Sequence, residues 1–269
     1  LFAEPAETSE PVRVPDGVPA SELQAEAETA FATAQTTPHD YVLVETAEQL
    51  RRAVERIGTC AEFCFDTETT GFDLFNDRIV GLSLAVEPHH AWYVPFTEEN
   101  SAEYAAIVKP LFENPGIAKI GQNMKFDLVV LRRIGIGIAG PKYDTTILHY
   151  LLDPEGRHNM SALAMKYLDY KPIEIESLIG RGAKQLTMDL VALDRVKEYA
   201  GEDADVTLRL KRVLWPEVER IGLQHLYFEI EEPLIEVLAD IETAGVRIDC
   251  GALAEYAVEL NAKMGELER

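Results

Sequence analysis

Short apolar runs separated by polar or turn-forming residues dominate the first half of the chain. Five of them have strand length and are rich in Val, Ile and aromatic residues: residues 41–44, 63–65, 79–86, 91–95 and 117–120. Such runs, bounded by turn residues, are typical of buried strands. Pro88, His89 and His90 separate the third run from the fourth, so we expect these two strands to be antiparallel neighbours.

Stretches with the apolar spacing of helices lie between these runs. Thr46 and Gln49 form a capping-box pattern that should open a helix continuing to Ile57. Further helices are predicted at residues 102–112 and 123–134, and the pattern stays mostly helical to about residue 225. The chain therefore predicts an α/β fold, a mixed β-sheet flanked by helices, with a short and mostly helical C-terminal segment.

Composition divides the chain into three parts. Residues 1–38 are rich in Ala, Glu, Pro and Thr, which predicts an acidic, disordered linker. Residues 39–226 hold the predicted sheet, and residues 227–269 form a separate segment because the pattern changes near Glu229. A first residue of Leu rather than Met suggests a piece excised from a longer polypeptide.

Acidic residues recur where the predicted elements could bring them together. One pair ends the run 63–65, where a spacing of two places both side chains on one face of a strand: Asp66 and Glu68. Two pairs have the four-residue spacing that places both members on one helix face: Asn123 with Asp127, and Tyr199 with Asp203. Two helix faces and one strand end could therefore converge on one site.

Four carboxylates at one site would raise each other's pKa unless divalent cations lay between them. Oxygen-only ligands suit Mg²⁺ or Mn²⁺ rather than Zn²⁺. Two such ions can activate a water on one side of a phosphodiester and stabilise the leaving oxygen on the other. We therefore predict metal-assisted phosphodiester hydrolysis by a site with four acidic ligands: Asp66, Glu68, Asp127 and Asp203.

The sequence around these acids resembles the three exonuclease motifs of the 3′→5′ proofreading domain of bacterial DNA polymerase I, a family-A polymerase. Similar segments follow one another in family order: residues 65–72, 121–127, 144–154, 156–158 and 199–207. A Glu at position 198 and a Tyr at position 199 match the tyrosine subclass of these exonucleases. The resemblance implies a ribonuclease-H-like fold, and it likens residues 227–269 to the first part of the polymerase region.

The resemblance also implies roles for the acidic residues and their neighbours. Asp66 would bridge both metal ions, Glu68 and Asp203 would complete the site of the attacking water, and Asp127 would support the second ion. Tyr199 would orient the water as a hydrogen-bond partner rather than a base, because a phenol of ordinary pKa is neutral near pH 7.

Further residues are expected to contact DNA. Phe72 would wedge against the terminal base, and stacking on an aromatic ring tolerates any base. Gln122 and Asn123 either contact the terminal nucleotide or cap the helix that follows them. Arg157 and His158, in a matching Gly-Arg-His, would contact a backbone phosphate. Residue 175 is Ile where the family has an aromatic residue, so the second wall of the base pocket is open to question.

Two other acids are excluded from the predicted metal site. Asp144 precedes Thr-Thr-Ile-Leu and is better interpreted as a helix N-cap. Asp205 follows Asp203 by two residues and falls on a different helix face.

Charge and composition limit the partners. The net charge of −22 opposes strong binding to nucleic acid, so we expect weak, metal-dependent binding of a single-stranded DNA 3′ end. No apolar stretch or signal segment suggests a membrane, and three scattered cysteines fit a reducing, cytoplasmic compartment of a bacterium, with use at the nucleoid. We expect a monomer whose other partner is the rest of the polymerase chain in cis.

Two alternatives to the proofreading hypothesis stay open. One is a catalytically silent structural or DNA-binding module, whose sequence mark would be a missing carboxylate. The other is an RNA exonuclease resembling ribonuclease D, which shares the motifs. The resemblance of residues 227–269 to the polymerase region and the acidic linker at residues 1–38 favour the DNA polymerase hypothesis over the ribonuclease D hypothesis.

Overall fold

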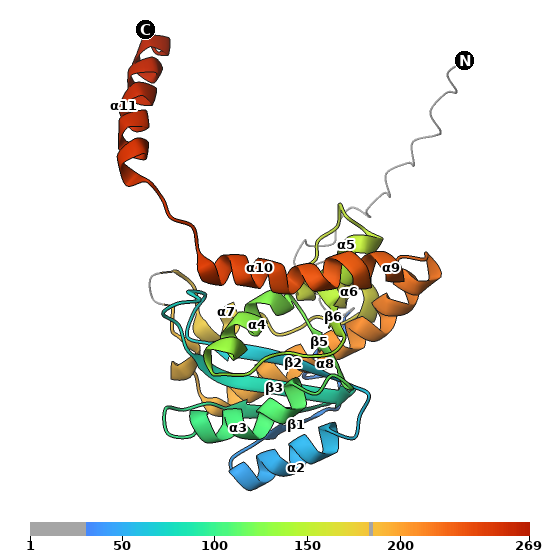
Figure 1. Ribbon diagram of the computed structural model, residues 1–269. Helices are drawn as coiled ribbons and strands as arrows, with labels where there is room; N and C mark the ends of the chain where they lie inside the picture. The colour runs from blue at the N-terminus through green and yellow to red at the C-terminus, as the bar shows by residue number, and fades with distance from the viewer. Residues whose placement is uncertain (1–30, 183–184) are drawn as a thin grey trace, which may run out of the picture.

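A six-stranded mixed sheet lies at the centre of the computed structural model, which describes residues 31–182 and 185–269 (Figure 1). Its strands are β1 (Asp40–Leu43), β2 (Glu62–Thr69), β3 (Ile79–Glu87), β4 (His90–Pro95), β5 (Ala118–Gly121) and β6 (Lys142–Asp144). They lie in the order β1-β4-β3-β2-β5-β6, with β2, β3 and β4 antiparallel and the other pairings parallel. The predicted mixed sheet is confirmed, with β6 as a strand that the sequence did not predict.

Helices surround this sheet, as the late helical pattern predicted. They are α2 (Ala47–Ile57), α3 (Ser101–Phe112), α4 (Met124–Arg133), α5 (Thr145–Leu152), α6 (Met160–Leu168), α7 (Glu176–Ile179), α8 (Leu193–Arg220), α9 (Gln224–Leu226), α10 (Glu232–Ala244) and α11 (Cys250–Leu267), with a 3₁₀ turn at Met188–Leu190 and a π turn at Tyr227–Glu231. The capping box of Thr46 and Gln49 is present at the start of α2. In the described residues no helix has the length and apolar character needed to cross a bilayer.

The alternation of side chains along β2 divides its residues between two cores. Phe63 and Phe65 point to the face that α2 and α3 cover, where their rings meet Phe112 edge to face at 5.2 and 5.0 Å. Cys64 points to the opposite face and packs with Ala204 of α8. Because Asp66 and Glu68 have the same parity as Cys64, they lie on the α8 face of the sheet.

Small residues let α8 lie close to the sheet. Ala85 and Ala91 face it from β3 and β4, and Gly201 leaves room for the ring of Tyr41. A Cβ at position 201 would lie 2.8 Å from Cγ of Tyr41, which is too close for an unstrained contact. This close approach brings Asp203, two residues further along α8, to the end of β2.

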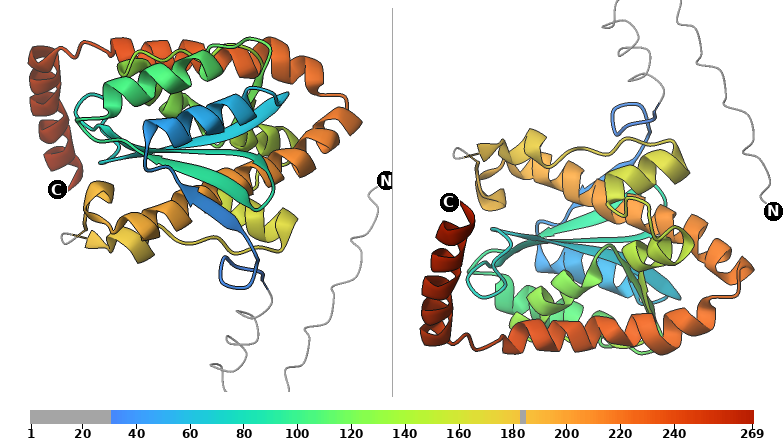
Figure 2. Two further views of the ribbon diagram at one scale, coloured as in Figure 1. Left: turned by 90° about the horizontal axis from the view of Figure 1, so that it is seen from below. Right: turned by 90° about the horizontal axis from the view of Figure 1, so that it is seen from above.

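The first part of the C-terminal segment packs on the folded body, whereas its last helix does not. Tyr227 is fully buried, and its hydroxyl accepts a hydrogen bond from the amide of Asp144 at 2.7 Å and donates one to the carbonyl of Lys142 at 3.0 Å. Helix α10 packs on α4 through an apolar cluster that includes Ile235 and Ala239. In contrast, α11 has no buried residue and extends away from the body (Figures 1 and 2).

The predicted N-terminal linker lies mostly outside the described residues, which begin at 31. Ala32 forms a parallel bridge with Tyr170, and its amide donates to the carbonyl of Asp169 at 2.9 Å. His39 Nε2 lies 2.8 Å from a carboxylate oxygen of Glu198 on α8. The end of this segment is therefore attached to the folded body.

Candidate active site

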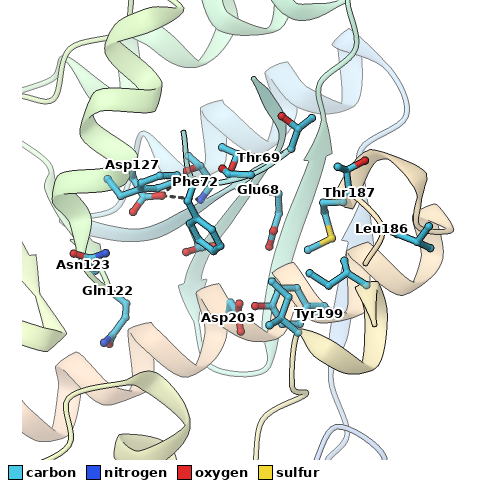
Figure 3. A pocket seen from close by; sticks show the side chains of 18 of the residues that line it. Glu68, Thr69, Phe72, Gln122, Asn123, Asp127, Leu186, Thr187, Tyr199 and Asp203 are labelled. Carbon is cyan, nitrogen blue, oxygen red and sulfur yellow. Dashed lines mark hydrogen bonds between the residues drawn. The ribbon is translucent and has the colours of Figure 1, made fainter. Parts of the chain in front are cut away.

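Three carboxylates meet where β2 passes α8. Asp66, Glu68 and Asp203 each offer one oxygen, and these oxygens all lie within 4.8 Å of one another. Glu68 and Asp203 are 6% and 4% exposed, so water screens their charges little. The structure thus brings together the strand residues Asp66 and Glu68 and the helix residue Asp203, as the sequence predicted. Figure 3 shows Glu68 and Asp203 in this pocket.

The fourth predicted ligand, Asp127, is held beside this cluster by β2 itself. Its Oδ1 accepts hydrogen bonds from the amide of Thr67 at 3.0 Å and from the hydroxyl of Thr67 at 2.5 Å. Asp127 lies in the first turn of α4 and is 4% exposed. Thr67 points to the side of β2 opposite Asp66, and sequence reasoning missed its role, although it is the middle residue of the first acidic motif.

Burial and crowding shift the protonation of all four acids. Burial raises the pKa of Glu68 to about 8, with a further contribution from the charge of Asp127. The pKa values of Asp66, Asp127 and Asp203 are also raised well above their ordinary range, mainly by burial and then by the neighbouring carboxylates. Without a compensating positive charge the site therefore favours partly protonated acids.

The donor set fits divalent cations. Glu68 Oε1 and Asp203 Oδ1 are buried and have no hydrogen-bond partner among the described residues. Buried, unpaired acceptor oxygens are costly unless a cation or donor satisfies them. Ligands that are all oxygen and all acidic suit Mg²⁺ or Mn²⁺.

Tyr199 lies one turn before Asp203 on α8, as the four-residue spacing predicted (Figure 3). Burial raises the pKa of its phenol well above the ordinary value, and the charges of Asp203 and Glu68 add to the shift. The phenol therefore stays protonated at neutral pH and can serve as a hydrogen-bond donor or acceptor, but not as a general base.

A cavity of about 560 Å³ opens over the carboxylates. Eight of the ten predicted site residues line it: Asp66, Glu68, Phe72, Gln122, Asn123, Asp127, Tyr199 and Asp203. Phe72 is 83% exposed, and its ring lies 6.1 Å from the ring of Phe126, measured between centroids. Aliphatic side chains that the sequence did not assign to the site also line the cavity: Ile179, Leu186 and Met188, together with Ile175.

Gln122 and Asn123 differ in what their side chains contact. Asn123 occupies the N-cap position of α4 with a left-handed backbone (φ 57°), but its side chain makes no capping hydrogen bond. The amide of Gln122 is bonded to protein: Nε2 donates to Thr146 Oγ1 at 2.6 Å and to the carbonyl of His158 at 2.8 Å, and Oε1 accepts from Thr145. The side-chain amide of Gln122 is therefore engaged within the protein, whereas that of Asn123 has no hydrogen-bond partner among the described residues.

Arg157 and His158 lie outside the cavity lining, in the loop between α5 and α6. Arg157 is exposed, whereas His158 is half-buried and reaches the cavity edge only through its carbonyl bond to Gln122.

The two acids that the sequence excluded from the metal site form hydrogen bonds with other parts of the protein. Asp144 caps α5 and also accepts the amides of Asn123 at 3.2 Å and Met124 at 2.7 Å. Asp205 accepts from the Tyr41 hydroxyl at 3.0 Å and from the His89 amide at 2.7 Å. Neither points to the carboxylate cluster.

Comparison with known proteins identifies the family of the chain. A family model described as 3′-5′ exonuclease matches residues 41–219. The chain belongs to the 3′-5′ exonuclease family of DNA polymerase I. This exonuclease chain is 43% identical to DNA polymerase I of Pseudomonas aeruginosa over 218 residues, which are 76% of the chain and 24% of that protein. It is 34% identical to DNA polymerase I of Rhizobium leguminosarum over 276 residues, 93% of the chain and 27% of that protein. The chain thus spans about a quarter of the length of these curated relatives.

Solved structures share the fold of this exonuclease chain at 19% identity. They include the POL domain of Pol1 from M. smegmatis in complex with DNA primer-template and dNTP (TM-score 0.65, 83% of this chain and 36% of that one). Escherichia coli RNase D, an exoribonuclease, matches with a TM-score of 0.61 over 75% of this chain and 51% of that one. Brucella melitensis NrnC with bound Mg²⁺ matches with a TM-score of 0.59 over 81% and 98%. The predicted ribonuclease-H-like fold is confirmed.

Proposed function

We propose that the chain removes deoxynucleoside monophosphates from the 3′ ends of single-stranded or frayed DNA, as the proofreading domain of a bacterial DNA polymerase I. The observation that carries this proposal is the cluster of Asp66, Glu68 and Asp203 oxygens within 4.8 Å, at the floor of a cavity with an aromatic and aliphatic wall. Acidic ligands and an apolar surface for a base are the two parts that such a reaction requires.

Each residue of the cluster has a proposed role. Asp66, Glu68 and Asp203 would hold one Mg²⁺ or Mn²⁺ ion, and Asp66 with Asp127 would hold a second. Bound divalent cations supply acidification of a water and charge stabilisation of the leaving oxygen. Tyr199 and Glu68 would orient that water toward the terminal phosphorus. Its oxygen forms the new P–O bond, the bond to the 3′ oxygen of the preceding nucleotide breaks, and that oxygen takes up a proton.

The cavity wall favours selection by fraying rather than by base identity. Phe72 is exposed, and the aliphatic side chains that also line the cavity offer no directional hydrogen bond to a base edge. A mismatch lowers the free energy needed to unpair the terminal nucleotides, so mismatched ends would reach the cavity more often. Asn123, which lines the cavity, would offer its side-chain amide to the terminal nucleotide, and Arg157 would contact a backbone phosphate.

The surroundings of the domain are also proposals. Residues 39–226 would carry the nuclease, and residues 227–269 would lead into a polymerase region in cis, although α10 packs on the nuclease helix α4. We place the protein in the bacterial cytoplasm, at the nucleoid, as a monomer.

Degradation of a 5′-labelled single-stranded DNA oligonucleotide tests the proposal. With Mg²⁺ or Mn²⁺ the chain should give a ladder that shortens from the 3′ end, and chelator or Asp66→Ala should abolish it. Asp194→Ala, an exposed acid on α8, is the matched control and should retain the ladder. Preference for an RNA oligonucleotide of the same sequence would instead support a ribonuclease D-like activity. No ladder from folded protein with either substrate would support the silent module.

A further inference from the structure

A pair of histidines fastens the loop that carries Arg157. His149, on α5, is fully buried, and its Nδ1 lies 2.7 Å from Nδ1 of His158 in the loop 153–159. The loop wraps closely over His149, because a Cβ added at Gly156 would lie 2.9 Å from the His149 ring. The remaining ring nitrogen of His149, Nε2, is buried and has no hydrogen-bond partner among the described residues. Its hydrogen bonding is thus directed to the loop.

The same loop is attached to the cavity edge from its other side. The His158 carbonyl accepts a hydrogen bond from Gln122 Nε2, and the Gln122 side chain also bonds Thr145 and Thr146 at the start of α5. Gln122 lines the cavity and directly precedes Asn123. His158 therefore links the buried face of α5 to a residue of the cavity wall.

We propose that His149 is a positioning residue for the binding of the 3′ end: its hydrogen bond to His158 fixes the loop 153–159 against Gln122 and thereby restricts the position of Arg157, the residue before His158. This inference rests on the proposed function for its kinetic consequence. In a chain with 47 acidic and 25 basic residues, the fixed placement of one guanidinium contributes to the capture of a phosphodiester strand.

The Nδ1–Nδ1 bond requires that one ring donates and the other accepts, so the two atoms share a single proton. The charged groups that face His149 are His158, Lys166 of α6 and Asp153, whose carboxylate lies 4.0 Å from Nε2 and bonds Lys166. Burial, Lys166 and His158 together lower the pKa of His149, against the opposite effect of Asp153. The His149 ring is therefore neutral at neutral pH and can share the proton of this bond.

Two amide substitutions separate this role from simple packing. His149→Asn places an amide near the position of Nδ1 and should preserve the bond, whereas His149→Gln places it near Nε2, away from His158. We expect the KM for a single-stranded DNA oligonucleotide to rise roughly three- to ten-fold in His149→Gln, the range of one net hydrogen bond. His149→Asn should stay near the wild-type KM, and kcat should change little in both variants. His225→Asn, at an exposed histidine, is the control.

A further readout completes the test. Hydrogen–deuterium exchange of the peptide covering 153–159 should be faster in His149→Gln than in the wild type and His149→Asn.

The outcomes are distinguishable from a failure of the proposed function. Equal KM and equal exchange in the Asn and Gln variants would overturn the proposal, as would a lower thermal midpoint without any change in KM or exchange. If the wild type degrades neither DNA nor RNA, the proposed function fails, and the exchange comparison still decides whether His149 positions the loop.

Discussion

Replacing Glu68 by Gln should stabilise the cation-free chain. The side chain is buried, its Oε1 has no partner among the described residues, and its pKa is raised to about 8 from an ordinary 4.5. Between these two values the folded state binds more protons than the unfolded state, so the free energy of unfolding falls as pH rises from 4.5 toward 8. Below pH 4.5 this destabilisation is absent, and above pH 8 it is complete.

The size of the effect follows from the linkage relation. With about 1.4 kcal/mol for each pH unit above the unfolded pKa, the destabilisation at pH 7.5 is at most roughly 4 kcal/mol. A buried amide without a full set of partners offsets about 1–3 kcal/mol of the gain. We expect a net stabilisation of about 1–3 kcal/mol, which is roughly 3 to 10 °C in the thermal midpoint for a domain of this size.

Thermal unfolding with chelator, and with Mg²⁺ or Mn²⁺, gives the measurement. In chelator Glu68→Gln should melt above the wild type at pH 7.5, and its midpoint should depend less on pH between 6 and 8. Added cation should raise the wild-type midpoint by mass action and the variant's much less. Glu55→Gln, at an exposed position on α2, is the control for loss of one charge. A lower midpoint for Glu68→Gln in chelator, or an unchanged pH slope, would refute the reasoning.

Three other predictions concern single residues. Tyr199→Phe should slow DNA hydrolysis roughly ten-fold, less than the roughly thousand-fold or greater loss in Asp203→Ala, because the tyrosine orients water whereas the aspartate would hold metal; equal losses in single-turnover assays would contradict this division. Phe72→Ala should raise KM by about 5- to 100-fold through lost base stacking, with kcat less affected, and a uniform effect on both constants would count against the wedge. Tyr227→Phe should lower the free energy of unfolding by about 1–3 kcal/mol in denaturant titrations, because the amide of Asp144 and the carbonyl of Lys142 lose a buried partner. Tyr150→Phe, at a half-exposed ring, should be near neutral.

Local patterns predicted most of the sheet. Apolar runs of strand length gave five of the six strands, and the two-residue spacing of Asp66 and Glu68 placed both on one face. Strand β6 was not predicted because it has only three residues, Lys142–Asp144, and is defined by its parallel pairing with β5. Pairing between segments that are distant along the chain leaves no periodic signal in so short a strand.

Only those parts of the site could be predicted whose function is evident from the type and spacing of the residues. Carboxylates at fixed spacings indicated the cluster, but the Thr67 bonds to Asp127 depend on how α4 meets β2. Gln122 gave no sign that its amide is fully bonded within the protein, because its partners lie 23 to 36 residues further along the chain. The aliphatic side chains that line the cavity together with Ile175 could not be predicted either, because their position depends on the path of the chain between α7 and α8.

Asp144 shows why a mutational survey of this domain could mislead. It is 2% exposed and accepts four backbone amides, those of Asn123, Met124, Thr146 and Ile147. One carboxylate thus fixes the starts of two helices, and one of these helices carries Asp127. A screen scored only by activity would class Asp144 with the metal ligands. Cation-induced stabilisation separates the groups, since a folded variant at Asp144 should still respond to Mg²⁺ or Mn²⁺ and a ligand variant should not.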